Sequence, residues 1–142
     1  MRISFDSAEL DLDLIHAFLS GSYWAQGIPR DTVERAVANS LCAGAYAPDE
    51  AGKDEQIGFA RLVTDKATFA YLADVFVLPA HRGHGVARAM LEALHVQPDL
   101  QGLRRWVLFT RDMQPLYAKF GWGAYPHPER LMVRDDPGIY TR

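Results

Sequence analysis

The sequence predicts an α+β fold, an α/β sandwich in which helices cover a mostly antiparallel central sheet. Three observations predict it. Two segments near the N-terminus carry apolar residues at helical spacing, and three extended segments joined by short turns follow them. A glycine-rich turn then leads into one more helix and one more strand, as in a strand–helix–strand unit. With 142 residues and no linker-like stretch, we expect one domain over residues 1–142.

The first third of the chain is predicted to hold a strand and two helices. Arg2 to Phe5 alternate as a short strand does, and Asp6 or Ser7 caps a helix. The inward positions of that helix are predicted to be Leu10, Leu14, Ala17 and Phe18. A loop over residues 20–28 separates it from a second helix that begins at Pro29 or Asp31. The second helix is expected to bury Val33, Ala36, Val37 and Ser40.

The central part is predicted to be a three-stranded meander followed by alternating helices and strands. The expected strands are Leu41 to Ala47, Ile57 to Thr64 and Thr68 to Val77. Beyond the glycine turn, we expect a helix from Val86 to His95, a strand from Trp106 to Thr110, a short helix from Pro115 to Phe120 and a closing strand from Leu131 to Val133. Gly121 is expected to cap the short helix in a left-handed conformation.

Composition and charge exclude several classes of protein. A net charge of −3 argues against general nucleic-acid binding, which needs a basic face. A single cysteine, Cys42, allows no internal disulfide and no multi-cysteine metal site, so we expect no metal and a reducing, cytoplasmic setting. Residues 1–30 do not resemble a signal peptide, and no stretch approaches the roughly 20 apolar residues that span a bilayer, so no membrane partner is expected.

The turn from His81 to Ala87 is the main functional signal. It joins a β-branched strand to a helix, and such a junction presents free backbone N–H groups to an anion, most often a phosphate. A Walker loop is excluded because Val86-Ala87 stand where Lys-Ser/Thr is required. A dinucleotide fingerprint needs a third glycine where Arg88 stands. A plain turn that uses glycine only for its positive φ is the alternative.

Two motifs resemble the GNAT superfamily of N-acyltransferases. Val77-Leu78-Pro79 followed by Arg82-x-x-Gly85-x-Ala87 is similar to the family's acyl-CoA motif, and the segment from Tyr117 to Trp122 is similar to its C-terminal Tyr-x-Lys-x-Gly-Phe segment. The resemblance implies a GNAT fold with six to seven strands and about four helices, splayed between the fourth and fifth strands. It also implies transfer of an acetyl group from acetyl-CoA to a primary amine that attacks directly in a ternary complex.

The resemblance assigns the residues that would bind acetyl-CoA. The pyrophosphate would lie on the amides of Gly83, His84, Gly85, Val86, Ala87 and Arg88, with Arg82 supplying charge. The pantetheine arm would pair with the strand edge at Val75, Phe76 and Val77, and the Val77 amide would face the thioester oxygen. His81 and His84 are otherwise ordinary solvated histidines.

Tyr117 and Asp74 are the predicted catalytic residues. The resemblance implies that Tyr117 protonates the leaving thiolate, while packing on a short amphipathic helix is its alternative role. Asp74 interrupts an apolar strand and is predicted to be a general base or an anchor for the substrate ammonium. A structural carboxylate paired with Arg61 or Arg111 is the alternative, and Asp112 and Arg111 allow the same two interpretations.

The acceptor is predicted to meet the loop between the first two helices. Tyr23 and Trp24 there would stack on an amine, or else pack the loop onto the sheet. The acceptor is a small-molecule amine or an amine of a protein or peptide. The resemblance allows a homodimer, and the sequence leaves the oligomeric state open. A non-catalytic acyl-CoA-binding or sensing module is the alternative function.

Overall fold

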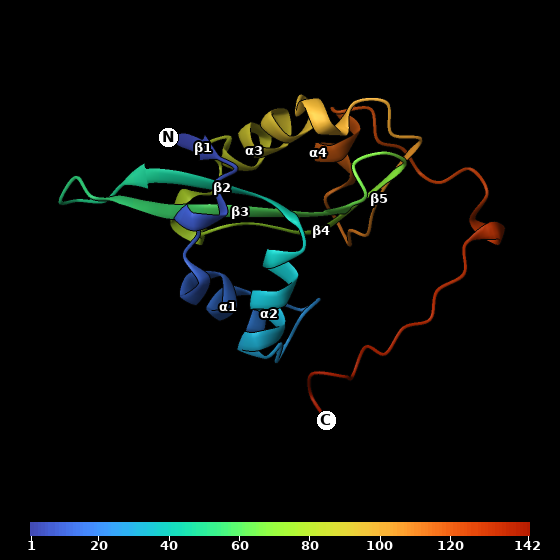
Figure 1. The fold of residues 1–142 in the computed structure, drawn as a ribbon, viewed down its shortest axis with the longest axis horizontal. Helices are drawn as coiled ribbons and strands as arrows, with labels where there is room; N and C mark the ends of the chain where they lie inside the picture. Colours follow the sequence, from blue (N-terminus) through green and yellow to red (C-terminus); the bar gives the residue numbers. More distant parts are fainter.

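The computed structural model describes all 142 residues and has three layers, with a five-stranded sheet between two pairs of helices (Figure 1). The strands follow one another across the sheet in chain order; they are β1 (Arg2–Ser4), β2 (Leu41–Pro48), β3 (Asp54–Thr64), β4 (Phe69–Val77) and β5 (Arg105–Leu108). The helices are α1 (Leu12–Ser20), α2 (Arg30–Ala38), α3 (Val86–His95) and α4 (Gln114–Ala118). All neighbouring strands are antiparallel except β4 and β5, which are parallel.

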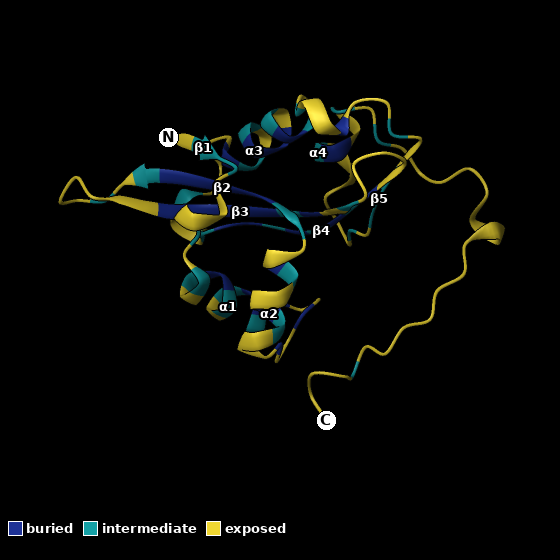
Figure 2. Ribbon diagram, in the orientation of Figure 1, coloured by how far each residue is buried: buried dark blue, intermediate teal, exposed yellow.

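Each face of the sheet packs against its own pair of helices. Ile15 and Val37 from α1 and α2 meet Phe59 and Phe76 on one face. On the other face, Met90 of α3 packs against small residues of β2 and β3, and further along the sheet α3 and α4 form another apolar cluster. Figure 2 shows that the buried residues lie along the strands and on the sheet-facing sides of the helices. Both layers are therefore needed to cover the sheet, as the predicted sandwich requires.

The sheet has five strands, so the prediction of six to seven is wrong. The missing closing strand was expected at Leu131, Met132 and Val133, which are instead irregular and 53%, 92% and 58% exposed. After Trp122, the backbone hydrogen bonds of the chain connect only residues within this C-terminal segment. The segment bows away from β5 (Figure 1), so it has no strand edge to pair with.

Helix α1 begins later than predicted because the chain contains two consecutive caps. Asp6 accepts a hydrogen bond from the Ala8 amide at 2.9 Å and starts only a short 3₁₀ turn. Asp11 then accepts from the Leu14 amide at 3.0 Å and starts α1 itself. The buried positions are Ile15 and Leu19, one residue beyond the predicted Leu14 and Phe18, while Ala17 is exposed.

The end of β4 has one free edge, and this positions the site. The register of β3 against β4 shifts between Arg61 and Leu62, which leaves Ala73 as an extra residue in β4. Pairing of β4 with β5 covers only Phe69 to Leu72, so the last part of β4 has no partner on that side. The Leu78 amide donates to the Ile57 carbonyl at 2.8 Å on the β3 side. Because strand residues alternate, the amides of Val75 and Val77 point to the free side.

None of the helices combines the length and the apolar character that crossing a membrane demands.

Candidate active site

A cleft of about 940 Å³ runs along the free edge of β4. Its walls come from both faces of the sheet, because the strands separate there. The α1–α2 loop contributes Tyr23 and Trp24 from one face, and α4 contributes Tyr117 from the other. The cleft therefore passes through the sheet between β4 and β5. Residues predicted to bind acetyl-CoA and residues predicted to bind the acceptor both line it.

The glycine turn forms one end of this cleft. Gly83 and Gly85 have φ values of 80° and 79°, in the left-handed region that L side chains rarely adopt. A Cβ built on either residue would meet no atom within 4 Å, so open space lies in front of the turn. Gly85 is the N-cap of α3, and no side chain caps the first amides of that helix. The turn thus presents unpaired N–H groups and the positive end of a helix dipole to the cleft.

Arg82 is held in place beside the turn. Its Nε donates a hydrogen bond to the Val77 carbonyl at 3.0 Å. This contact occupies the carbonyl at the free end of β4 and leaves the terminal nitrogens of the guanidinium for another partner. The Arg82 guanidinium is thus fixed next to the turn, where its terminal nitrogens can bind a phosphate group.

Eight of the ten residues predicted to bind the cofactor line the cleft: Val75, Phe76, Val77, Arg82, Gly83, Gly85, Val86 and Ala87. The other two, His84 and Arg88, are outside its lining. His84 is exposed, with Nδ1 3.4 Å from the His81 carbonyl, and Arg88 forms an ion pair with Glu92 at 3.1 Å on the surface of α3. Their side chains therefore point away from the space where the other eight converge.

Tyr117 is fixed in the cleft by the way α4 ends. The Trp122 amide donates to the Tyr117 carbonyl at 3.3 Å, and the Gly121 amide donates to the Ala118 carbonyl at 3.2 Å. With Gly121 at φ 89°, these bonds form a Schellman motif, as the glycine at this position predicts. The Tyr117 side chain is buried, and its hydroxyl has no hydrogen-bond partner within the protein. Burial, with a smaller contribution from the nearby Tyr23, raises the pKa of the Tyr117 phenol.

An aromatic stack lies next to Tyr117, between α3, β5 and the segment that follows α4. The His95 ring lies between Trp106 and Phe120, with centroid distances of 4.9 Å and 5.1 Å. Its Nδ1 is 2.6 Å from the Leu91 carbonyl, and its Nε2 accepts from the Trp122 indole at 3.0 Å. Because an indole N–H can only donate, Nε2 of His95 is the accepting nitrogen, and its Nδ1 faces the Leu91 carbonyl.

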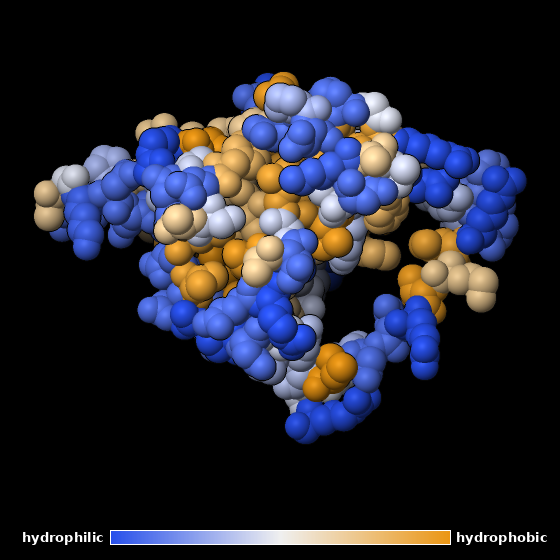
Figure 3. Space-filling model, in the orientation of Figure 1, coloured by the Kyte–Doolittle hydropathy of each residue, from blue (hydrophilic) through white to orange (hydrophobic).

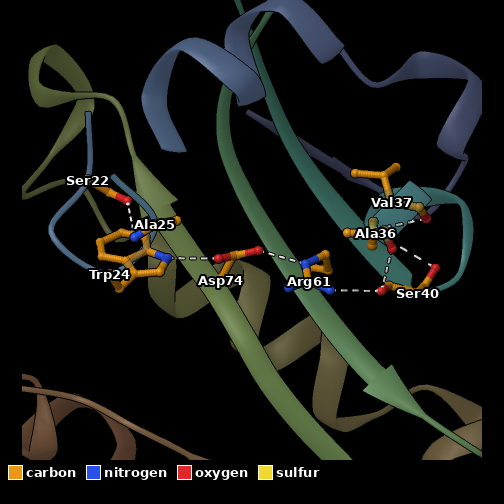
Figure 4. A network of polar contacts seen from close by, with 9 residues as sticks. Ser22, Trp24, Ala25, Ala36, Val37, Ser40, Arg61 and Asp74 are labelled. Atoms are coloured by element: carbon orange, nitrogen blue, oxygen red, sulfur yellow. Dashed lines mark hydrogen bonds and ion pairs between the residues drawn. The ribbon is translucent and has the colours of Figure 1, made fainter. Parts of the chain in front are cut away.

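Asp74 lies in a polar network rather than in the cleft (Figure 4). One carboxylate oxygen accepts from the Trp24 indole at 2.8 Å, and the other accepts from Arg61 Nε at 2.6 Å. Arg61 in turn donates to the Ser40 hydroxyl at 3.2 Å. The carboxylate is only 6% exposed, and both of its oxygens have partners. This geometry favours the structural alternative with Arg61 as the partner, and a base role for Asp74 stays a prediction.

Tyr23 and Trp24 both line the cleft, but each already has a partner. The Trp24 indole is bound to Asp74, and the Arg111 guanidinium lies 3.9 Å from the centroid of the Tyr23 ring. Arg111 thus occupies one face of Tyr23, the position that a cationic amine would take in the predicted stacking. Asp112, the next residue, is the only carboxylate that lines the cleft.

Sequence reasoning missed several residues of the site. Tyr71, Phe109 and Met113 line the cleft, and the rings of Tyr71 and Phe109 lie 5.9 Å apart, edge to face. The predicted strand from Trp106 to Thr110 includes Phe109, but β5 ends at Leu108. Phe109 and Met113 therefore lie beyond the strand at the open edge, where their apolar side chains are exposed. Cys42, by contrast, is a buried core residue as predicted, and burial raises the pKa of its thiol to about 12.

Comparison with known proteins identifies the family. Residues 42–123 match the family model described as the acetyltransferase (GNAT) domain. A protein of Gibberella zeae whose name describes it as an acetyltransferase is 37% identical over 135 residues. The match covers 82% of this chain and 75% of the Gibberella protein.

Solved structures give the same result. A GNAT-family acetyltransferase of Xanthomonas campestris pv. campestris superposes with a TM-score of 0.93 at 46% identity, covering 99% of this chain and 96% of its own. Rv2747 of Mycobacterium tuberculosis, solved in complex with CoA and NLQ, has a TM-score of 0.65 at 25% identity, over 85% of this chain and 70% of its own. The chain belongs to the GNAT family of acetyltransferases.

Proposed function

We propose that this protein transfers an acetyl group from acetyl-CoA to a primary amine, by direct attack of the amine on the thioester. Family membership implies acyl transfer from acetyl-CoA onto an amine acceptor. One observation carries the finer proposal: the open glycine turn, the free edge of β4 and Tyr117 all line a single cleft. Together they match the three parts of an acyl-CoA, which are its phosphates, its pantetheine arm and its thioester.

The donor would lie along the turn and the strand edge. The amides from Gly83 to Arg88 would bind the pyrophosphate, with the terminal nitrogens of Arg82 beside it. The open space at Gly83 and Gly85 lets phosphate oxygens approach the backbone without meeting a Cβ. The free amides of Val75 and Val77 would pair with the amide groups of pantetheine, as an added strand does.

Two groups of this chain would then serve the chemistry. The Val77 amide would donate a hydrogen bond to the oxygen that gains negative charge when the amine attacks the thioester carbon. The Tyr117 hydroxyl would donate a proton to the departing thiolate as the carbon–sulfur bond breaks. Its raised pKa keeps the phenol protonated at neutral pH, which is the state required of a donor.

Asp112 fits the amine side better than Asp74 does. Asp112 is exposed to the cleft and has no ion-pair partner, so its carboxylate is free to attract an ammonium ion and to accept a proton from it. Asp74 remains the residue that fixes Trp24 and Arg61, which places it behind the wall of the cleft.

Thiol release from acetyl-CoA across a panel of primary amines tests the proposed function. We expect release that depends on the amine, saturates with it and yields one acetylated amine per thiol. Tight acetyl-CoA binding without release on any amine, small or peptidic, would favour a non-catalytic acyl-CoA-binding module instead.

We also propose that the protein forms a homodimer. The exposed apolar segment at Leu131, Met132 and Val133 supports this, since exposed apolar patches on single chains commonly mark interfaces. Light scattering on the full chain tests it, and a monomer at high micromolar concentration would contradict it.

A further inference from the structure

A second cavity, of about 200 Å³, lies under α1 and α2 next to the proposed acceptor side of the cleft. Most of its lining residues are apolar, such as Val33, Ala36 and Phe59, and the charged side chains of Arg61 and Asp74 line it as well. In size the cavity compares with a cavity of about 150 Å³ in another protein that binds benzene. The space under α2 is thus large enough for a compact group of about the size of a phenyl ring.

The cavity and the cleft share a wall. Trp24, Tyr71 and Ala73 line both of them. The Trp24 indole is held by Asp74, but the Tyr71 hydroxyl makes no hydrogen bond within the protein. Rotation of Tyr71 would therefore break no polar contact, only its edge-to-face contact with Phe109. A ligand with its amine in the cleft would then extend past this ring into the cavity.

The charge of the cavity floor selects against a charged group. Asp74 and Arg61 form an ion pair there, with Nε and Oδ2 2.6 Å apart, so the floor carries no net charge. A carboxylate or an ammonium that entered would find both charges already paired with each other, so it would lose its hydration without gaining a free counter-ion. An uncharged hydrocarbon group avoids this loss.

The outer wall comes from the far end of the chain. Tyr140 lines the cavity, although the C-terminal segment before it bows away from the body and leaves an opening visible in Figure 3. The segment returns at Gly27, where a Cβ would lie only 2.7 Å from the Tyr140 carbonyl oxygen. Gly27 has a φ of 81°, so both its backbone conformation and the close approach of Tyr140 require glycine.

From these observations we propose that the cavity under α2 is a specificity subsite for a compact, uncharged apolar group of the acceptor amine, such as a phenyl group, with Tyr140 as its outer wall. The inference rests on the proposed function, because it assigns the amine to the cleft. It predicts that aralkylamines are better acceptors than small alkylamines.

The test compares methylamine with 2-phenylethylamine in the wild-type protein and two pairs of variants. We expect a KM for 2-phenylethylamine at least tenfold lower than for methylamine, as burying a group of this size in an apolar pocket typically gives. Ala36→Phe fills the cavity, and we expect it to raise the KM for 2-phenylethylamine roughly tenfold while the Kd for acetyl-CoA changes less than twofold. Ala38→Phe, on the exposed side of the same helix, should change neither value.

Tyr140→Ala provides an independent variant if Ala36→Phe folds poorly. Opening the outer wall should raise the KM for 2-phenylethylamine, and Ile139→Ala, at an exposed neighbouring side chain, should not. Equal KM values for the two amines, or unchanged values in both cavity variants, would overturn the subsite while leaving acetyl transfer intact.

A direct binding measurement separates this result from a failure of the proposed function. If no amine releases thiol, saturation-transfer NMR with 2-phenylethylamine still reports on the cavity. Binding that Ala36→Phe abolishes and Ala38→Phe preserves would support the subsite, and binding that is equal in both variants, or absent from the wild type, would overturn it.

Discussion

The two halves of the cleft are built in different ways. The half assigned to acetyl-CoA consists of one continuous stretch of chain, from the free edge of β4 through the glycine turn to the start of α3. Its contribution is mainly backbone amides. The half assigned to the acceptor, with the adjoining cavity, is assembled from side chains that are far apart in the sequence. Tyr23 and Trp24 of the cleft lie near one end of the chain, and Tyr140 of the cavity lies near the other.

This difference has a physical consequence for specificity. A site made of backbone amides depends on glycine positions and helix geometry, which tolerate few changes, and it binds the part of the substrate that stays constant. A site made of side chains changes its shape with each substitution. We therefore expect variants of the turn to affect all acceptors equally, and variants around α2 and Tyr140 to affect them selectively.

The largest expected effect comes from Gly85→Val. A branched side chain at φ 79° strains the turn and also fills the space where phosphate would lie. We expect acetyl-CoA affinity to fall by about a thousandfold, as measured by calorimetry, since a change of about 4 kcal/mol is the scale of losing several phosphate contacts.

Gly52 offers a matched control. It has a φ of 82° and no atom within 4 Å of a built Cβ, and it lies in the β2–β3 loop, away from the cleft. Gly52→Val should lower the free energy of unfolding by about 1–2 kcal/mol, as Gly85→Val does, because both put a branched side chain in the left-handed conformation. The affinity for acetyl-CoA should be unchanged in Gly52→Val. Equal affinities in the two variants would show that the turn does not bind the donor.

Tyr117→Phe should have the next largest effect. Losing a positioned proton donor should lower kcat about a hundredfold, while the Kd for acetyl-CoA stays within about twofold. Burial raises the pKa of this phenol, so donation in the wild type should persist up to an alkaline pH and be lost only as the pH rises through that raised pKa.

Tyr125→Phe, at a partly exposed tyrosine outside the cleft, is the control for Tyr117→Phe. A kcat that is unchanged in Tyr117→Phe, with the same alkaline limb as the wild type, would leave Tyr117 with a packing role alone.

Asp74→Asn should act on stability more than on chemistry. The change leaves the mostly buried Arg61 without its anion, and we expect a loss of about 2–3 kcal/mol in the free energy of unfolding, less than for a fully buried pair because Arg61 is 18% exposed. Denaturant titration measures it. Asp112→Asn should instead raise the KM for the amine severalfold and leave stability unchanged. The reverse pattern would return the base role to Asp74.

Much of the donor half could be predicted from the sequence because its determinants are local. The bounds of α3, the left-handed cap at Gly121 and the open glycine turn all follow from residues within a few positions of one another. The start of α1 could not be predicted in the same way, because Asp6 and Asp11 both act as caps. The sequence does not show that the helix begun at Asp6 stops after one 3₁₀ turn.

The acceptor half required tertiary information. The sequence indicated that Asp74 needs a partner but could not choose between Arg61 and Arg111, because the choice depends on the register of β3 against β4. Arg111 instead stacks on Tyr23, across the splayed strands. Nothing local to Tyr140 indicates that it lines a cavity beside α2, because a contact over that sequence distance depends on the path of the whole C-terminal segment.

Calorimetric titration of acetyl-CoA into the wild-type protein shows whether the open turn between β4 and α3 binds acetyl-CoA. We predict saturable binding of one molecule per chain with a micromolar Kd, together with a clear rise in melting temperature. The absence of heat and of thermal stabilisation at millimolar acetyl-CoA would show that this turn is not an acetyl-CoA site.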